Sequence, residues 1–263
     1  MHIDLTGRTA LITGGSTGLG LAMARRLSES GANVAILARR PDVIDTAIAS
    51  LQQTAKGKVL GIPCDVSKPE PLAAAFAQAS AAFGAIDIVI NNAGISNAMP
   101  FAEATDEIWQ QDLDLKLFAA IRLARLAMPG MIARRWGRII NVLNIGAKAP
   151  RGASAPTSVS RAAGMALTKV LSHEGAPHNV LVNAMLVGLI RSDQWDRRYE
   201  AAKAAGSNED YEDFLAKLGA GVPMKRLGTA EEFANLACFL ASDAAGYITG
   251  TAINVDGGSS PVV

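Results

Sequence analysis

Short runs of apolar residues alternate along this chain with longer segments in which apolar residues recur at helical spacing. Each run is continuously apolar, as in parallel strands that are buried on both faces. The seven runs occupy residues 9–13, 33–37, 58–63, 86–90, 137–143, 179–185 and 251–258. Helices are expected from Gly18, over 42–54, 70–83 and 106–134, and from about Ala155 and Ala230. This rhythm predicts one α/β domain over residues 1–263, a doubly wound fold on a seven-stranded parallel sheet with ligands at the carboxyl ends of the strands.

The composition is that of an ordinary globular protein. Of 263 residues 49% are hydrophobic, so the chain can bury a sizeable core. A formal net charge of +1 gives no electrostatic reason to bind nucleic acid or a membrane. The cysteines, Cys64 and Cys238, have no CxxC spacing, and the histidines, His2, His173 and His178, are expected at the surface. We expect a soluble, cytoplasmic protein without a signal peptide or a metal site.

The stretch TGGSTGLG joins the first strand to the first helix. Glycine permits a positive φ and a close approach of the backbone to a phosphate, whose charge the helix N-terminus stabilises. A glycine-rich turn without a ligand would have the same composition, but further nucleotide features follow it at consistent places. The residues expected to hold the phosphates are Gly14, Ser16, Thr17, Gly18, Leu19 and Gly20.

The end of the second strand bears on the choice between NAD and NADP. An acidic residue there would bind the free ribose of NAD, but the sequence has Ala38, followed by Arg39 and Arg40. Two guanidinium groups can bind a 2′-phosphate through charge-assisted hydrogen bonds. The alternative, that the two arginines only make a surface loop soluble, leaves the missing acidic residue unexplained. NADP(H) is therefore expected in preference to NAD(H).

Motifs along nearly the whole chain resemble those of the short-chain dehydrogenase/reductase family. They are TGGSTGLG, CDVS at 64–67, NNAG at 91–94, GRIIN at 137–141, RLGTAEE at 226–232 and YITGTAINVDGG at 247–258. The resemblance implies a Rossmann fold, reduction of a carbonyl or oxidation of an alcohol, and a homotetramer or homodimer. It also implies further cofactor contacts from Asp65 and Val66 beside the adenine, from Asn92, Ala93 and Gly94, and from Gly188 and Ile190 near the nicotinamide.

The positions of the family's catalytic residues hold other side chains here. Family members use a tyrosine as acid or base, a lysine on the nicotinamide ribose, a serine on the substrate oxygen and a helix asparagine. Counting from the motifs, these positions hold Thr157, Arg161, Asn144 and Lys116. Thr157 is far less acidic than a phenol and is a poor direct substitute. Arg161 can bind ribose hydroxyls, and Asn144 can still donate to a carbonyl oxygen.

Lys116 is the candidate proton donor, with Arg161 anchoring the ribose. Burial and the charge of Arg161 would both lower the pKa of the Lys116 amine. The sequence also allows a purely structural role, in which Lys116 reaches solvent or pairs with Asp112 or Asp114.

Residues 189–228 interrupt the rhythm between the sixth strand and the last helix, and contain Trp195, Tyr199, Tyr211 and Phe214. The position predicts a substrate lid, although two amphipathic helices packed on the body would have the same pattern. From a lid, Tyr199 or Tyr211 could swing in as an alternative acid. The aromatic residues suggest a medium-sized, partly apolar substrate.

Three functions are consistent with this sequence. The first is an NADP-dependent oxidoreductase with a rebuilt proton-donor site, favoured by the intact glycine loop. The second is an inactive NADP-binding or interaction protein, favoured by loss of the catalytic residues. The third is a lyase or isomerase on the same fold, since Arg161 resembles the arginine of the cofactor-free halohydrin dehalogenases. The retained glycine loop counts against the third, and the first is our prediction.

Overall fold

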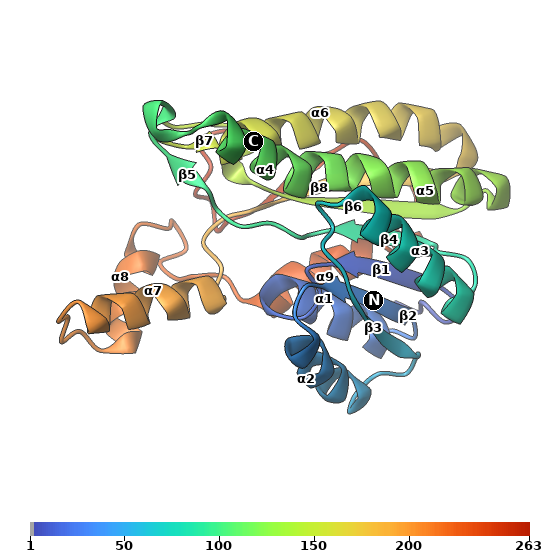
Figure 1. Cartoon of the computed structure of the whole chain (residues 1–263), viewed down its shortest axis with the longest axis horizontal. Coiled ribbons are helices and arrows are strands. Elements are labelled where there is room, and N and C mark those ends of the chain that lie inside the picture. Colours follow the sequence, from blue (N-terminus) through green and yellow to red (C-terminus); the bar gives the residue numbers. More distant parts are fainter. Residues whose placement is uncertain (1–2) are drawn as a thin grey trace.

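The computed structural model describes residues 3–263, so His2 lies outside the described part of the chain. Its centre is a parallel sheet of seven strands in the order β3-β2-β1-β4-β6-β8-β9 (Figure 1). The strands are β1 (Thr9–Thr13), β2 (Asn33–Ala38), β3 (Val59–Pro63), β4 (Ile88–Asn91), β6 (Gly137–Asn144), β8 (Val180–Val187) and β9 (Ala252–Val255). The doubly wound fold and its seven-stranded parallel sheet are confirmed, because each predicted apolar run overlaps one of these strands.

Helices cover both faces of the sheet. One face packs against α1 (Gly18–Glu29), α2 (Pro41–Gln52) and α9 (Ala230–Leu240) around the fully buried Phe233. The other packs against α3 (Pro69–Phe83), α5 (Ala119–Arg134) and α6 (Thr157–Gly175) around the fully buried Leu123. These two cores position the carboxyl ends of the strands at one edge of the molecule.

Two features near that edge were not predicted. The segment expected as one helix over 106–134 is divided into α4 (Asp106–Leu113), a π-helical turn (Asp114–Phe118) and α5. A second, two-stranded antiparallel sheet pairs β5 (Ala98–Met99) with β7 (Ala155–Pro156). Strands of two residues are too short to leave a periodic pattern in the sequence.

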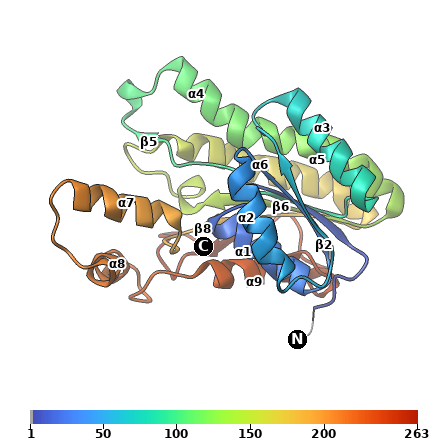
Figure 2. The ribbon, with the colours of Figure 1, turned by 60° about the horizontal axis from the view of Figure 1, so that its bottom comes forward.

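Residues 189–228 form two helices, α7 (Asp193–Ala204) and α8 (Tyr211–Ala220). They project from the body beyond the carboxyl end of β8 (Figures 1 and 2). Their aromatic residues contact one another, with the Tyr199 ring centroid 4.9 Å from that of Tyr211 and 5.6 Å from that of Phe214. Among residues 3–263 no helix has the length and apolar character needed to cross a membrane.

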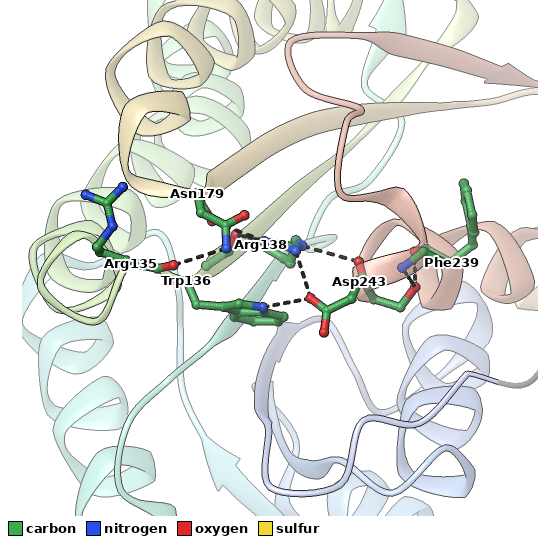
Figure 3. A network of polar contacts seen from close by, with 9 residues as sticks. Arg135, Trp136, Arg138, Asn179, Phe239 and Asp243 are labelled. Carbon is green, nitrogen blue, oxygen red and sulfur yellow. Dashed lines mark hydrogen bonds and ion pairs between the residues drawn. The ribbon is translucent and has the colours of Figure 1, made fainter.

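The amino ends of the strands are joined by a polar network around Trp136 (Figure 3). The guanidinium carbons of Arg8 and Arg138 lie 3.7 and 4.3 Å from the Trp136 ring centroid. The indole N–H donates to Asp243 at 2.9 Å, and Arg138 donates to the same carboxylate oxygen at 3.2 Å. Arg138, only 1% exposed, also donates to the carbonyl of Asn179 at 3.1 Å. The network ties β6, the start of β8 and the end of α9 together.

Candidate active site

The glycine loop after β1 takes a shape that side chains would prevent. Gly14 and Gly18 have φ of +63° and +52°, and a Cβ on Gly20 would collide with the Gly14 carbonyl oxygen. Thr17, at the N-cap of α1, makes no side-chain hydrogen bond to the helix, and the first turn has no acidic residue. The N–H groups of the first turn of α1 have no partner within the helix, so with the helix dipole they can bind an anion, and the loop fits the pyrophosphate of a dinucleotide.

Asn92 fixes this loop rather than facing outward. Its side-chain amide donates to the carbonyls of Thr13 and Gly14 at 3.0 and 3.1 Å. The main-chain N–H groups of Asn92 and Ala93 both donate to the Thr13 hydroxyl at 2.9 Å. The expected cofactor residues after β4 are thus joined to the phosphate loop, with the Asn92 side chain serving as a brace.

The expected adenine end of the site follows β2 and β3. Arg39 and Arg40 are exposed where β2 ends. Burial alone would raise the pKa of Asp65, but hydrogen bonds from Ser67 and the charges of Arg39 and Lys68 lower it on balance. Arg39 therefore lies close enough to Asp65 to stabilise the charged form of its carboxylate. The neighbouring Val66 is buried, with 4% of its surface exposed.

The expected nicotinamide end follows β8. A Cβ on Gly188 would approach the Cβ of Asp256 to 2.5 Å, so the close packing of β8 on the chain after β9 requires glycine. The Ile190 side chain is buried in the core, and its carbonyl accepts a hydrogen bond from the Trp195 indole at 2.9 Å. The side chain of Ile190 is therefore not available to a ligand.

Lys116 lies in the π-helical turn with its side chain 1% exposed. It does not reach solvent, and of the two partners considered it pairs with Asp112. Asp114 instead pairs with Arg122, at 3.1 Å. The Lys116 amine also donates to the Thr157 hydroxyl at 2.8 Å. The structure thus brings together two of the predicted catalytic residues, Lys116 and Thr157.

Asp112 is a fully buried carboxylate at the centre of this group. Besides Lys116, it accepts a hydrogen bond from the Ser160 hydroxyl at 2.6 Å and one from the Asn97 side-chain amide at 3.4 Å. From the sequence, Asp112 was expected only as a possible structural partner of Lys116, and nothing in the sequence indicated Ser160 or Asn97. The one available signal was that Asp112 precedes Lys116 by four residues, one helical turn.

Arg161 stands beside Lys116 at the start of α6. It donates to the Val142 carbonyl at 2.6 Å, and a Cβ on Gly94 would collide with its guanidinium group. Its Nε is buried without a hydrogen-bond partner among the described residues, as is the Oδ1 of Asn144 at the end of β6. Buried polar atoms normally have partners, so these two atoms are candidates to bind a ligand. The Arg161 Nε can donate to a ribose hydroxyl, whereas the Asn144 Oδ1 can only accept from a donor on the ligand.

Burial and charge change the acidity of both cations. Burial is the main reason that the pKa of Lys116 falls from its ordinary value to about 8; Arg161 lowers it further, while Asp112 acts in the opposite direction. Burial likewise lowers the pKa of Arg161 to about 10, against the charge of Asp112. Lys116 therefore titrates in a range useful for proton transfer, whereas Arg161 stays charged near neutral pH.

The alternative acids lie elsewhere in this structure. The Tyr211 hydroxyl donates to Asp196 and the Tyr199 hydroxyl to the Glu209 carbonyl at 3.2 Å, so both bind within the projecting segment. His173 is exposed and His178 is half-buried, at the end of α6 opposite Thr157.

Comparisons with known proteins agree with this architecture. A family model described as enoyl-(acyl carrier protein) reductase matches residues 14–260. The uncharacterised oxidoreductase YvrD of Bacillus subtilis is 35% identical over 261 residues, 98% of each chain. L-sorbose reductase of Gluconobacter frateurii, solved with NADPH and L-sorbose, is 35% identical over 100% of both chains, with a TM-score of 0.95.

A second solved structure is also similar over nearly its whole length. It is an NADPH-bound short-chain oxidoreductase of Pseudomonas aeruginosa PAO1, described as containing an atypical catalytic center. It is 35% identical and has a TM-score of 0.91 over 99% of this chain and 100% of the other. With a matching fold, family model and relatives over nearly its whole length, the chain belongs to the short-chain dehydrogenase/reductase family of oxidoreductases.

Proposed function

We propose that this protein is an NADP(H)-dependent oxidoreductase of the carbonyl reductase or alcohol dehydrogenase type with a non-standard proton-donor site. In this proposal Thr157 and Arg161 replace the family's tyrosine and lysine, and Lys116 supplies the proton. The observation that carries the proposal is the buried Lys116 amine, which is bonded to Asp112 and Thr157. The Pseudomonas aeruginosa relative, described as having an atypical catalytic center and bound to NADPH, supports it.

Each residue has a definite role in this proposal. Bound NADPH supplies the hydride, and the loop from Gly14 to Gly20 holds its phosphates. Arg161 binds the nicotinamide ribose through its Nε, which has no partner among the described residues. Asn144 donates its amide hydrogen to the substrate carbonyl and polarises it. Lys116 then provides the proton that the reduced oxygen requires.

The projecting segment 189–228 is proposed as a substrate lid. It leaves the sheet at the carboxyl end of β8, where the predicted site lies, and its aromatic residues suit a medium-sized, partly apolar substrate (Figure 2). We also propose that the protein acts in the cytoplasm as a homotetramer or homodimer, because small residues on α5 and α6 permit close helix packing.

The preference for NADP(H) predicts the effect of removing the two arginines after β2. The double variant Arg39→Ala/Arg40→Ala should bind NADPH about 10- to 100-fold more weakly, because it loses charge-assisted bonds to the 2′-phosphate. NADH affinity should change less than about twofold and serves as the internal control. Calorimetric titration measures both, and an equal loss for the two cofactors would contradict the assignment.

The acidity of Lys116 predicts the pH dependence of turnover. The protonated amine is the donor, so kcat/KM for carbonyl reduction should fall as the pH rises through about 8. Alcohol oxidation needs the neutral amine as acceptor and should rise over the same range. Initial rates between pH 6 and pH 10 measure both limbs, and a limb that persists in Lys116→Met would belong to another group.

The experiment that tests the proposed function is a titration with NADP(H) and NAD(H), followed by a carbonyl panel monitored for NADPH loss. Binding with turnover supports a reductase. Tight binding without turnover favours the inactive NADP-binding protein. Absence of binding overturns the assignment of the glycine loop and favours a cofactor-independent lyase or isomerase.

A further inference from the structure

The geometry around Lys116 raises the question of how its proton would leave. Its side chain is 1% exposed, and two of its three N–H donors are directed at Asp112 and Thr157. Thr157 is 4% exposed and Asp112 is fully buried, so the amine is enclosed by its two partners. Of these two partners only Thr157 carries a hydroxyl that can pass a proton onward, so the route for a proton from Lys116 runs through Thr157.

Thr157 has the properties of such a carrier. A hydroxyl can accept two hydrogen bonds and donate one. Both acceptor positions are occupied, by the Lys116 amine at 2.8 Å and by the main-chain N–H of Asn97 at 3.0 Å. Within residues 3–263 the structure contains no acceptor for the hydroxyl's own hydrogen. The two incoming bonds orient the oxygen and leave its proton to be donated elsewhere.

We propose that Thr157 is a catalytic relay, which passes a proton from Lys116 to the substrate oxygen. This inference rests on the proposed reductase function. As the substrate carbon receives hydride, the Thr157 O–H bond breaks and a new O–H bond forms on the substrate oxygen. In the same step one Lys116 N–H bond breaks and its proton passes to Thr157 Oγ1. Thr157 ends as a hydroxyl and Lys116 as a neutral amine, so the low acidity of an isolated threonine is not limiting.

Asp112 is the positioning residue of this relay. It binds Lys116, Ser160 and the Asn97 side chain, and so joins α4, α6 and the segment before β5. The charged groups that act on Lys116 are Asp112 and Arg161. Asp112 favours the ammonium before the transfer, and Arg161 favours the neutral amine after it.

Two substitutions at Thr157 test the relay. Thr157→Val keeps the branched shape but removes the hydroxyl, and should lower kcat by about 10²-fold while NADPH affinity changes less than about twofold. Thr157→Ser keeps the hydroxyl and should lose less than about fivefold. Thermal melts of both variants show whether each is folded. Equal turnover by the Thr157→Val and Thr157→Ser variants would overturn the relay.

A second measurement does not depend on turnover. The titration of Lys116 can be followed by NMR of ¹³Cε-labelled lysine without cofactor, with the signal assigned by its loss in Lys116→Met. Loss of the Thr157 acceptor should lower the pKa of Lys116 in Thr157→Val, whereas Thr157→Ser should leave it in place. Identical titration in all three proteins would exclude the Lys116–Thr157 hydrogen bond and overturn the relay.

The two measurements separate the relay from the proposed function. A wild-type enzyme that reduces a carbonyl, combined with an unimpaired Thr157→Val variant, overturns the relay and leaves the reductase standing. A wild-type protein that binds NADPH but reduces nothing on the panel overturns the reductase and the relay together. A shifted Lys116 titration with impaired turnover only in Thr157→Val supports both.

Discussion

The Lys116→Met variant is expected to reduce a confirmed carbonyl substrate about 10²- to 10⁴-fold more slowly than the wild type, the range that general acids contribute. Methionine keeps the unbranched length of the side chain but has no proton to give. Lys116 is the proposed proton source, and its pKa of about 8 suits that role. The measurement is kcat under saturating NADPH at pH 7, with NADPH affinity determined separately.

The same substitution leaves Asp112 buried without its cation. Removing one partner of a buried pair costs about 3–5 kcal/mol, so a slow variant could simply be an unfolded one. The double variant Lys116→Met/Asp112→Asn removes both charges and should recover stability without recovering turnover. Lys56→Met, at an exposed lysine before β3, is the matched surface control and should remain active. Turnover by folded Lys116→Met within about threefold of the wild type would remove Lys116 from the mechanism.

Trp136→Ala is expected to lower the free energy of unfolding by about 3–5 kcal/mol, the usual cost of deleting a large buried aromatic side chain. Trp136 is 8% exposed, and the guanidinium groups of Arg8 and Arg138 both lie over its ring. The substitution leaves a cavity and removes both cation–π contacts and the hydrogen bond to Asp243. Urea unfolding with the slope compared between variants measures the loss.

Trp136→Phe separates the ring from its N–H group. It retains an aromatic surface for both arginines and loses the bond to Asp243, so its cost should be about 1 kcal/mol. Both variants should bind NADPH normally while folded, because Trp136 lies at the amino end of β6 and the glycine loop at the carboxyl end of β1. A cost below about 1 kcal/mol for Trp136→Ala would show that neither the burial of the ring nor its contacts with the two cations adds much to stability.

The sheet was predictable because its strands are buried on both faces. Each strand is a short continuous apolar run, and runs such as 137–143 cannot form an alternating, half-exposed strand. Glycine positions such as Gly14 and Gly20 were predictable for a related reason, since a side chain there would collide with the chain or require an unfavourable φ.

The catalytic end was only partly predictable. Helical spacing favours Asp112, four residues before Lys116, over Asp114, two residues before it, and the structure contains the first pair. The π-helical turn that holds Lys116 is announced by no periodic pattern. Ser160 and Asn97 meet Asp112 through tertiary contacts between segments distant in sequence. Motif matching also cannot give side-chain direction, so it could not show that the Asn92 side chain braces the glycine loop or that the Ile190 side chain is buried in the core.

Because of the π-helical turn between α4 and α5, the site depends on the number of residues in this turn as well as on their side chains. An i→i+5 turn holds one residue more than an α-helical turn, and each residue of an α-helix advances the helix by about 100°. Deleting one residue between Asp114 and Phe118 would let α4 and α5 join as one regular helix. The α4 helix, with Asp112, would then rotate by about 100° relative to α5. A substitution here removes a functional group, whereas a one-residue deletion would change the position of Asp112 relative to α5 while every proposed functional side chain is still present.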